Sequence, residues 1–104
     1  MLLNAGIPVN SLDNFGQSPL HYAVRSGNLA ALKTLLDHDA NPNVADRVYG
    51  NSALHLAATY GSDKMMSALL DAGADPQQTR KNGEDPKKIL TRFHKRDWDS
   101  IEMD

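Results

Sequence analysis

The chain repeats its own sequence. A shift of 34 positions places residues 16–27 on residues 50–61, and both segments begin Gly-x-Ser-x-Leu-His-x-Ala. The same shift places residues 35–37 on residues 69–71. A repeat of this length is typical of an array of supersecondary units that stack side by side. Because such an array offers a long regular surface instead of one enclosed pocket, the sequence favours macromolecular binding over catalysis.

The repeated positions resemble the ankyrin repeat. The first full copy matches that family's pattern at Asp13, Gly16, Ser18, Pro19, Leu20, His21, Ala23, Gly27, Leu35, Leu36 and Ala40. The second copy matches it at Asp46, Gly50, Ser52, Leu54, His55, Ala57, Gly61, Leu69, Leu70, Gly73 and Ala74. The second copy also has one residue more than the family spacing ahead of its first glycine, which explains the period of 34.

Two partial copies flank the full ones. Residues 2–10 resemble the end of a preceding copy, and residues 82–86 resemble the start of a following one. The following copy is degenerate, because Lys87 and Lys88 stand where the family has Leu and His. Since the chain begins in mid-repeat, we expect it either to be a segment of a longer array or to have that end covered by a partner.

The resemblance implies an all-α ankyrin-repeat solenoid. In such a fold, antiparallel helix pairs stack and β-hairpin-like finger loops project from one side. It divides a single domain, 1–104, into a partial N-terminal repeat (1–12), two repeats (13–45 and 46–79) and a degenerate C-terminal capping repeat with an acidic tail (80–104).

The first helix of each copy has a recognisable start. Ser18 precedes Pro19, and Asp85 precedes Pro86. A side-chain oxygen can accept an orphan backbone N–H at a helix start, and proline has a helical φ in the first turn. We therefore predict helices that begin at Pro19 and Pro86, the former ending near residue 26.

The second helices follow from hydrophobic periodicity. Apolar residues three and four apart predict helices over about 29–37 and 63–71. A glycine suits the left-handed turn after each helix, and Gly73 provides one. Asp39 holds that place in the first copy, at a cost of about 1 kcal/mol.

The resemblance also implies which positions contact a partner. They lie on the finger loops and on the exposed side of the first helices. In this sequence they are Asn14, Phe15, Gln17, Tyr22, Arg25, Ser26, Val48, Tyr49, Asn51, Thr59, Tyr60, Lys81, Asn82 and Glu84. Phe15 and Tyr49 fall at finger tips, where an exposed aromatic is typical of an interface hot spot. The alternative is that each ring packs against the neighbouring finger.

Catalytic and metal sites have little support. His21 and His55 lie one period apart and have the residue type of metal ligands. The resemblance instead implies that these imidazoles bond to the capping hydroxyl and nearby backbone. The chain has no cysteine and no grouping of nucleophile, base and orienting residue. We therefore expect no reaction, no cofactor and no metal.

Asn10 and Asn43 occupy the loop position where the family often has asparagine. This resemblance extends to substrates of the factor-inhibiting asparaginyl hydroxylase. The alternative is that each asparagine has a structural role and bonds adjacent loops.

Charge is uneven along the C-terminal part, although the formal net charge is only −2. Residues 80–96 carry Arg80, Lys81, Lys87, Lys88, Arg92, Lys95 and Arg96, and residues 97–104 are acidic. The basic segment is interpreted either as a solvated cap surface that pairs with the acidic tail, or as a nucleic-acid contact or a nuclear import signal. Trp98 and Ile101, three apart, either dock onto the stack or belong to a disordered tail.

The expected function is binding of another protein, as a scaffold, adaptor or inhibitor. A nucleic-acid-proximal regulator and a purely structural spacer in a longer repeat protein are the alternatives. No apolar run is long enough to span a membrane, and no small-molecule substrate is expected. The lack of a membrane-spanning run and the lack of cysteine together favour a cytoplasmic or nuclear location.

Overall fold

The computed structural model describes residues 9–60, 62–96 and 98–101 of the 104-residue chain. These residues form α1 (Pro19–Arg25), α2 (Leu29–Asp37), α3 (Ala53–Tyr60), α4 (Asp63–Asp71), α5 (Pro86–His94) and the short 3-10 helix η2 (Trp98–Ser100). The same residues include no β-strand. The all-α fold class is therefore confirmed.

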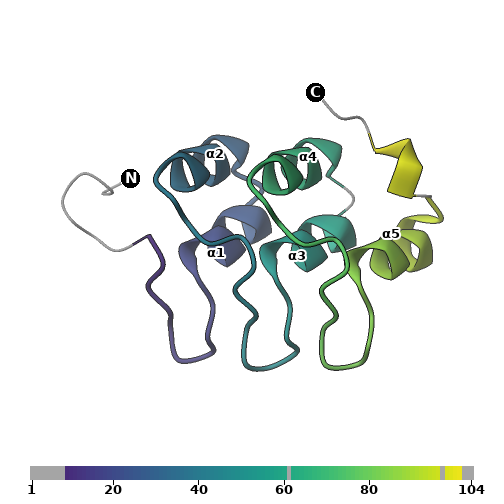
Figure 1. Cartoon of the computed structure of the whole chain (residues 1–104), viewed down its shortest axis with the longest axis horizontal. Helices are drawn as coiled ribbons and strands as arrows, with labels where there is room; N and C mark the ends of the chain where they lie inside the picture. The colour runs from purple at the N-terminus through teal and green to yellow at the C-terminus, as the bar shows by residue number, and fades with distance from the viewer. Residues whose placement is uncertain (1–8, 61, 97, 102–104) are drawn as a thin grey trace.

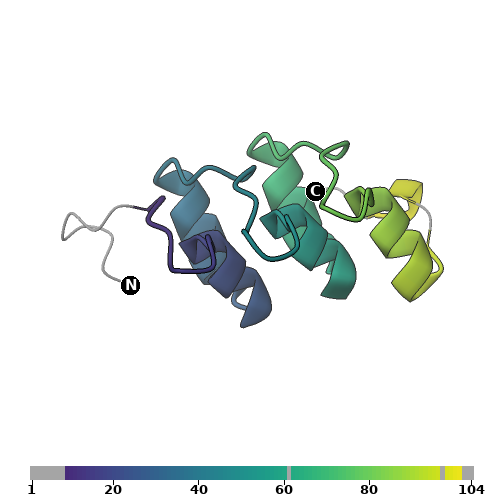
Figure 2. The same cartoon turned by 90° about the horizontal axis from the view of Figure 1, so that it is seen from below.

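The helices lie in two rows (Figure 1). α1, α3 and α5 form one row, α2 and α4 form the other, and α1 packs on α2 as α3 packs on α4. Figure 2 shows the rows from below, running along the 41 Å long axis of the molecule. The loops that precede α1, α3 and α5 all project from one edge, so the stack is a repeat solenoid with a regular margin of loops (Figure 1).

The helix starts are confirmed at both prolines. α1 begins at Pro19 and α5 begins at Pro86. The Asp85 carboxylate accepts a backbone N–H of the first turn of α5 at 2.9 Å. The Ser18 hydroxyl instead lies 2.9 Å from Nδ1 of His21, so the cap of α1 includes an imidazole.

The helix ends use the left-handed backbone region, as the sequence indicates. Gly73, after α4, has φ +98°, and Asp39, after α2, has φ +66°. Asp39 therefore adopts the conformation that glycine adopts in the second copy. The expectations for Gly61 and for residues 1–8 lie outside the described residues.

The core lies between the two helix rows. Isolated helices of seven to nine residues, such as these, are marginal in water, so burial against neighbours has to stabilise them. The largest fully buried apolar side chains are Leu20, Leu32, Leu54, Met66, Leu69, Ile89 and Leu90. They come from all five α-helices, which makes one continuous core.

The C-terminal segment closes this core beside α5. Ile101 is buried and Trp98 packs against the core, so these residues dock onto the stack. Arg96 forms an ion pair with Asp63 at 2.6 Å between Nη2 and Oδ1, which ties the segment after α5 to the start of α4.

The loop asparagines bond adjacent turns. The Asn43 amide donates to the Gly73 carbonyl at 3.1 Å, and its side-chain oxygen accepts the Asp75 N–H at 2.7 Å. Asn10 makes the equivalent pair of bonds one repeat earlier. The structural role considered for these asparagines is thus present in the fold.

Two buried histidines, His21 of α1 and His55 of α3, connect their helices to the finger that follows. Nδ1 of His21 accepts the Ser18 N–H at 3.0 Å, and Nδ1 of His55 accepts the Ser52 N–H at 3.1 Å. The Nε2 atoms lie 2.7 Å and 3.1 Å from backbone carbonyls of Asn51 and Glu84, respectively. Because a carbonyl only accepts, Nε2 carries the hydrogen. Both ring nitrogens are therefore used in hydrogen bonds, which leaves no lone pair for a metal.

We predict that Asp39→Gly stabilises the protein by about 0.5–1 kcal/mol. Glycine adopts a positive φ without the Cβ clash that an L-residue has there. Urea unfolding followed by circular dichroism measures the change. Lys33→Gly, in the exposed interior of α2, is the control and should destabilise by about 1 kcal/mol. A lower melting temperature for Asp39→Gly would contradict the assignment.

We predict that His55→Ala destabilises the protein by about 2–4 kcal/mol. The substitution leaves the Ser52 N–H and the Glu84 carbonyl without partners and opens a cavity in the buried site. His38→Ala, at an exposed position, should change the free energy of unfolding by less than about 0.5 kcal/mol. Equal effects of the two substitutions would show that the buried bonds contribute nothing.

Candidate partner-binding surface

Three finger loops form one edge of the molecule, below the helices in Figure 1. Each loop is closed at its base by one backbone hydrogen bond of 2.9–3.0 Å. The donor and acceptor residues of these bonds are Asp13 and Gln17, Asp46 and Asn51, and Arg80 and Glu84. We call residues 13–17, 46–51 and 80–84 together the finger edge.

Neighbouring fingers are bonded directly to one another. The Arg47 N–H donates to the Phe15 carbonyl at 2.8 Å, and the Lys81 N–H donates to the Tyr49 carbonyl at 2.9 Å. Gly16 permits this approach, because a Cβ there would lie 2.8 Å from Cγ of Arg47. The finger edge is therefore one connected structure and not three independent loops.

The second finger accommodates its extra residue in a turn held by the Asp46 carboxylate. Its Oδ1 accepts the N–H groups of Val48, Tyr49 and Gly50 at 2.7–3.1 Å. The inter-finger bonds then settle the register, since Tyr49 takes the place that Phe15 takes in the first finger.

The aromatic finger tips are exposed. Phe15 is 58% exposed and Tyr49 is 62% exposed, which argues against the alternative in which each ring packs on the next finger. Tyr22 and Tyr60, from α1 and α3, are also exposed, and the Tyr22 hydroxyl donates to the Asp13 carboxylate. The bond from Tyr22, followed by the N–H of Gln17, lowers the pKa of Asp13 from its ordinary value.

The structure exposes most of the other predicted positions. Asn14, Arg25, Ser26, Val48, Lys81 and Asn82 are exposed, while Thr59 and Glu84 are half-buried. Gln17 and Asn51 are different, with only 8% and 6% exposure. Asn51 lies under the third finger, where its side-chain oxygen accepts from Arg80 at 3.3 Å. The expectation that Gln17 and Asn51 offer side chains to a partner is therefore wrong.

Glu84 gathers two arginines beside the third finger. Its carboxylate pairs with Arg80 at 2.5 Å and with Arg92 through two bonds of 2.7 Å, and Asn82 donates to it at 2.9 Å. The Arg92 and then the Arg80 bonds lower the pKa of Glu84 to about 2. Among the described residues, Arg80 and Arg92 pair with Glu84 and Arg96 pairs with Asp63, while pairing of the basic segment with the acidic tail stays a prediction. Residues 97 and 102–104 of that tail lie outside the described residues.

Three exposed residues escaped the sequence analysis. Phe93, at the end of α5, is exposed, and the Arg92 guanidinium carbon lies 4.3 Å from its ring centroid. Continuing the repeat alignment through the degenerate copy finds it, because Phe93 follows Tyr60 at nearly one period. Leu12 carries no comparable signal. The extra residue of the second finger left open which of its residues, Arg47 included, corresponds to which residue of the first finger.

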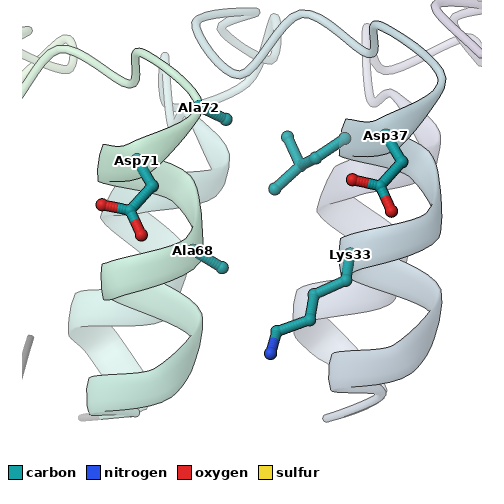
Figure 3. A pocket seen from close by; sticks show the side chains of 6 residues that line it. Lys33, Asp37, Ala68, Asp71 and Ala72 are labelled. Carbon is teal, nitrogen blue, oxygen red and sulfur yellow. The ribbon is translucent and has the colours of Figure 1, made fainter. Parts of the chain in front are cut away.

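A groove runs between α2 and α4 on the other helix row (Figure 3). It has a volume of about 350 Å³. Its lining residues are Lys33, Leu36, Asp37, Ala68, Asp71 and Ala72. It mixes both charge signs with small side chains and has no exposed aromatic, so it is a weaker candidate than the finger edge.

No cluster of three or more potential metal ligands occurs among the described residues. Within the same residues, no helix has the length and hydropathy needed to cross a bilayer.

Residues 1–80 match the family model for ankyrin repeats in three copies. A 40-residue stretch is 52% identical to tyrosine-protein kinase Shark of Drosophila melanogaster and covers 38% of this chain and 4% of that protein. A 46-residue stretch is 48% identical to a transient receptor potential cation channel subfamily A member 1 homolog of Caenorhabditis elegans, covering 44% and 4%. A 45-residue stretch is 38% identical to ankyrin repeat domain-containing protein 37 of Xenopus tropicalis, covering 43% and 28%. The chain thus spans a small part of the relatives that it matches.

We predict that Glu84 stabilises the fold in a pH-dependent way. Glu84→Gln should cost about 1 kcal/mol at pH 7, because it weakens the bonds to two arginines. The folded pKa of about 2 lies below the ordinary value of 4.5. The difference between the two proteins should therefore shrink as the pH falls from 4.5 and vanish near pH 2.

Urea unfolding of both proteins between pH 2 and pH 7 measures this difference. In 1 M NaCl the difference at pH 7 should be smaller, because salt screens half-exposed ion pairs. A difference that stays constant down to pH 2 would rule out an ionised Glu84 as its source.

Proposed function

Because this chain belongs to the ankyrin repeat family, we propose that its finger edge and the exposed ends of α1, α3 and α5 bind another protein. Ankyrin repeats are generally protein–protein interaction modules and are generally not catalytic. The observation that supports the choice of surface is the row of exposed aromatics, above all Phe15 and Tyr49. Aromatic side chains bury a large area on binding and are enriched among the residues that contribute most of the binding free energy of an interface.

The rigidity of the finger edge supports the same proposal. Each finger is closed by its own backbone bond and joined to the next finger by another. A surface that is already ordered loses less conformational entropy on binding than a mobile loop does. The finger edge therefore suits binding of a folded protein or of a peptide segment.

The role that we propose is that of a scaffold, adaptor or inhibitor in the cytoplasm or nucleus. Similar stretches occur in a protein named as a tyrosine kinase and in one named as a channel homolog, each of which is far longer than this chain. A small segment shared by proteins of such different names fits a binding module that works beside other domains. The lack of cysteine in the chain fits a reducing compartment.

A nucleic-acid role for the basic segment is the weaker alternative. Arg80, Arg92 and Arg96 already pair with carboxylates, and the chain has a formal net charge of −2. Binding to phosphates depends on several cations that release counterions together. A purely structural spacer predicts no partner, and the exposed aromatics argue against it.

We predict that the double substitution Phe15→Ala and Tyr49→Ala weakens binding without unfolding the protein. The expected change in the free energy of unfolding is below about 0.5–1 kcal/mol, because both residues are largely exposed. Affinity for a partner should fall at least about tenfold, or about 1.4 kcal/mol. Affinity capture with mass spectrometry identifies partners, and calorimetry with the purified partner measures affinity.

The matched control is Lys33→Ala with Lys64→Ala, on the outer helices α2 and α4. This variant should keep full affinity, since both lysines lie away from the finger edge (Figure 3 shows Lys33). If the aromatic variant binds as tightly as the control, the finger edge is not the partner-binding surface. If the aromatic variant unfolds, the rings are structural.

A further inference from the structure

Aromatic and cationic residues alternate along the finger edge. Arg47 is bonded through its N–H to the Phe15 carbonyl, and Lys81 is bonded in the same way to Tyr49. The aliphatic stems of both cations lie over the preceding finger. A Cβ on Gly16 would stand 2.8 Å from Cγ of Arg47, and a Cβ on Gly50 would stand 3.4 Å from Cγ of Lys81. The same pair of an exposed aromatic and an exposed cation therefore occurs twice, one repeat apart.

The carboxylates of the fingers are used inside the fold. Asp46 is buried, and its Oδ1 accepts three backbone N–H groups of its own finger. Asp13 accepts the N–H groups of Phe15 and Gln17 at 2.9 Å and also the Tyr22 hydroxyl. Glu84, as described above, is shared by Arg80 and Arg92.

The cations at the finger tips differ from these carboxylates in their partners. None of the ion pairs in the described part of the chain includes Arg47 or Lys81. The Lys81 ammonium contacts only a neutral acceptor, the Arg47 carbonyl, among the hydrogen bonds of these residues. Exposed carboxylates lie elsewhere, such as Asp37 and Asp71 beside the outer groove (Figure 3). Arg47 and Lys81 are thus exposed cations of the finger edge that can pair with a negatively charged group of a partner.

We infer that the finger edge selects an acidic segment of the partner protein, an inference that rests on the proposed function. Carboxylates of the segment pair with Arg47 and Lys81, and its apolar side chains cover Phe15 and Tyr49. Charge complementarity of this kind sets which partner is chosen and how fast it associates. The rings supply the desolvated contact area that keeps it bound.

The spacing of the two cations indicates the form of the segment. Each finger consists of two adjacent backbone segments and is hydrogen-bonded to the next finger. Because hydrogen-bonded segments lie about 5 Å apart, equivalent positions of neighbouring fingers are about 10 Å apart. An extended segment in the polyproline II conformation advances about 9 Å over three residues and returns to the same side. Two carboxylates three residues apart therefore match Arg47 and Lys81.

Nucleic acid fits this surface less well. Phosphate binding would be served by the longer basic segment, but three of its arginines are paired with carboxylates. Only two cations alternate with aromatics along the fingers, and duplex contacts normally require more. We therefore treat nucleic acid as an outcome that would overturn the inference.

The test is a selection of random 12-residue peptides displayed on phage against the immobilised full chain. Peptides are kept if binding is lost with the Phe15→Ala, Tyr49→Ala variant. The expected result is enrichment of Asp and Glu at positions three residues apart. Fluorescence anisotropy then compares an enriched peptide with its Glu→Gln counterpart and with a 20-base-pair duplex DNA.

Matched variants locate the charge contact. Arg47→Gln and Lys81→Gln should each weaken the acidic peptide at least about fivefold, and the effect should diminish in 0.5 M NaCl. Lys64→Gln, which removes an exposed cation from α4, should leave the affinity unchanged. Thermal unfolding confirms that the three variants remain folded.

The outcomes separate the two proposals. Peptides that depend on Phe15 and Tyr49 but show no acidic enrichment would overturn the acidic-segment inference and leave the proposed function standing. A selection that yields no peptide dependent on these rings would count against both. Tighter binding of the duplex DNA than of the acidic peptide, or equal losses in Lys64→Gln and Arg47→Gln, would also overturn the inference.

Discussion

The hydrogen bond from each buried imidazole to the next finger joins the helices of the molecule to its loops. His21 and His55 sit in the row of first helices, yet their Nε2 atoms reach carbonyls about 30 residues further along the chain. These bonds hold the helix row and the finger edge in a fixed relation. Burial lowers the pKa of His55, so acidification below about pH 6.5 works against the folded state at this joint. These two hydrogen bonds help the loops, which contain no β-strand in the described residues, to form an ordered surface.

The charge of the finger edge follows from how the fingers are closed. A tight loop exposes backbone N–H groups that need acceptors, and a carboxylate can accept several of them. Asp13 and Asp46 serve the first two fingers in this way. These carboxylates are thereby engaged in hydrogen bonds of the loops, while none of the ion pairs in the described part of the chain includes Arg47 or Lys81. A requirement of loop folding thus produces a surface that favours acidic partners.

Local chemistry made much of the fold predictable, and contacts between repeats limited the rest. The helices over 29–37 and 63–71 were placed correctly because their apolar spacing is a property of the segment alone. The positive φ of Asp39 followed from its place after a helix. Gln17 and Asn51 were wrongly expected at the surface, since Asn51 is covered by a finger some 30 residues away. Arg47 was overlooked because only the inter-finger bonds show which residue opposes Phe15.

The repeating unit, the ends of its helices and the aromatic tips of its fingers can be read from the order of residues alone. Each of these depends on residues a few positions apart, through helix capping, backbone sterics or hydrophobic periodicity. Which polar groups remain available at the surface depends instead on how the repeats pack in three dimensions. Glu84 joins Arg80 and Arg92 from a finger and a helix, and Arg96 reaches Asp63 in the preceding repeat. Such pairings depend on distances through space, which the order of residues along the chain does not specify.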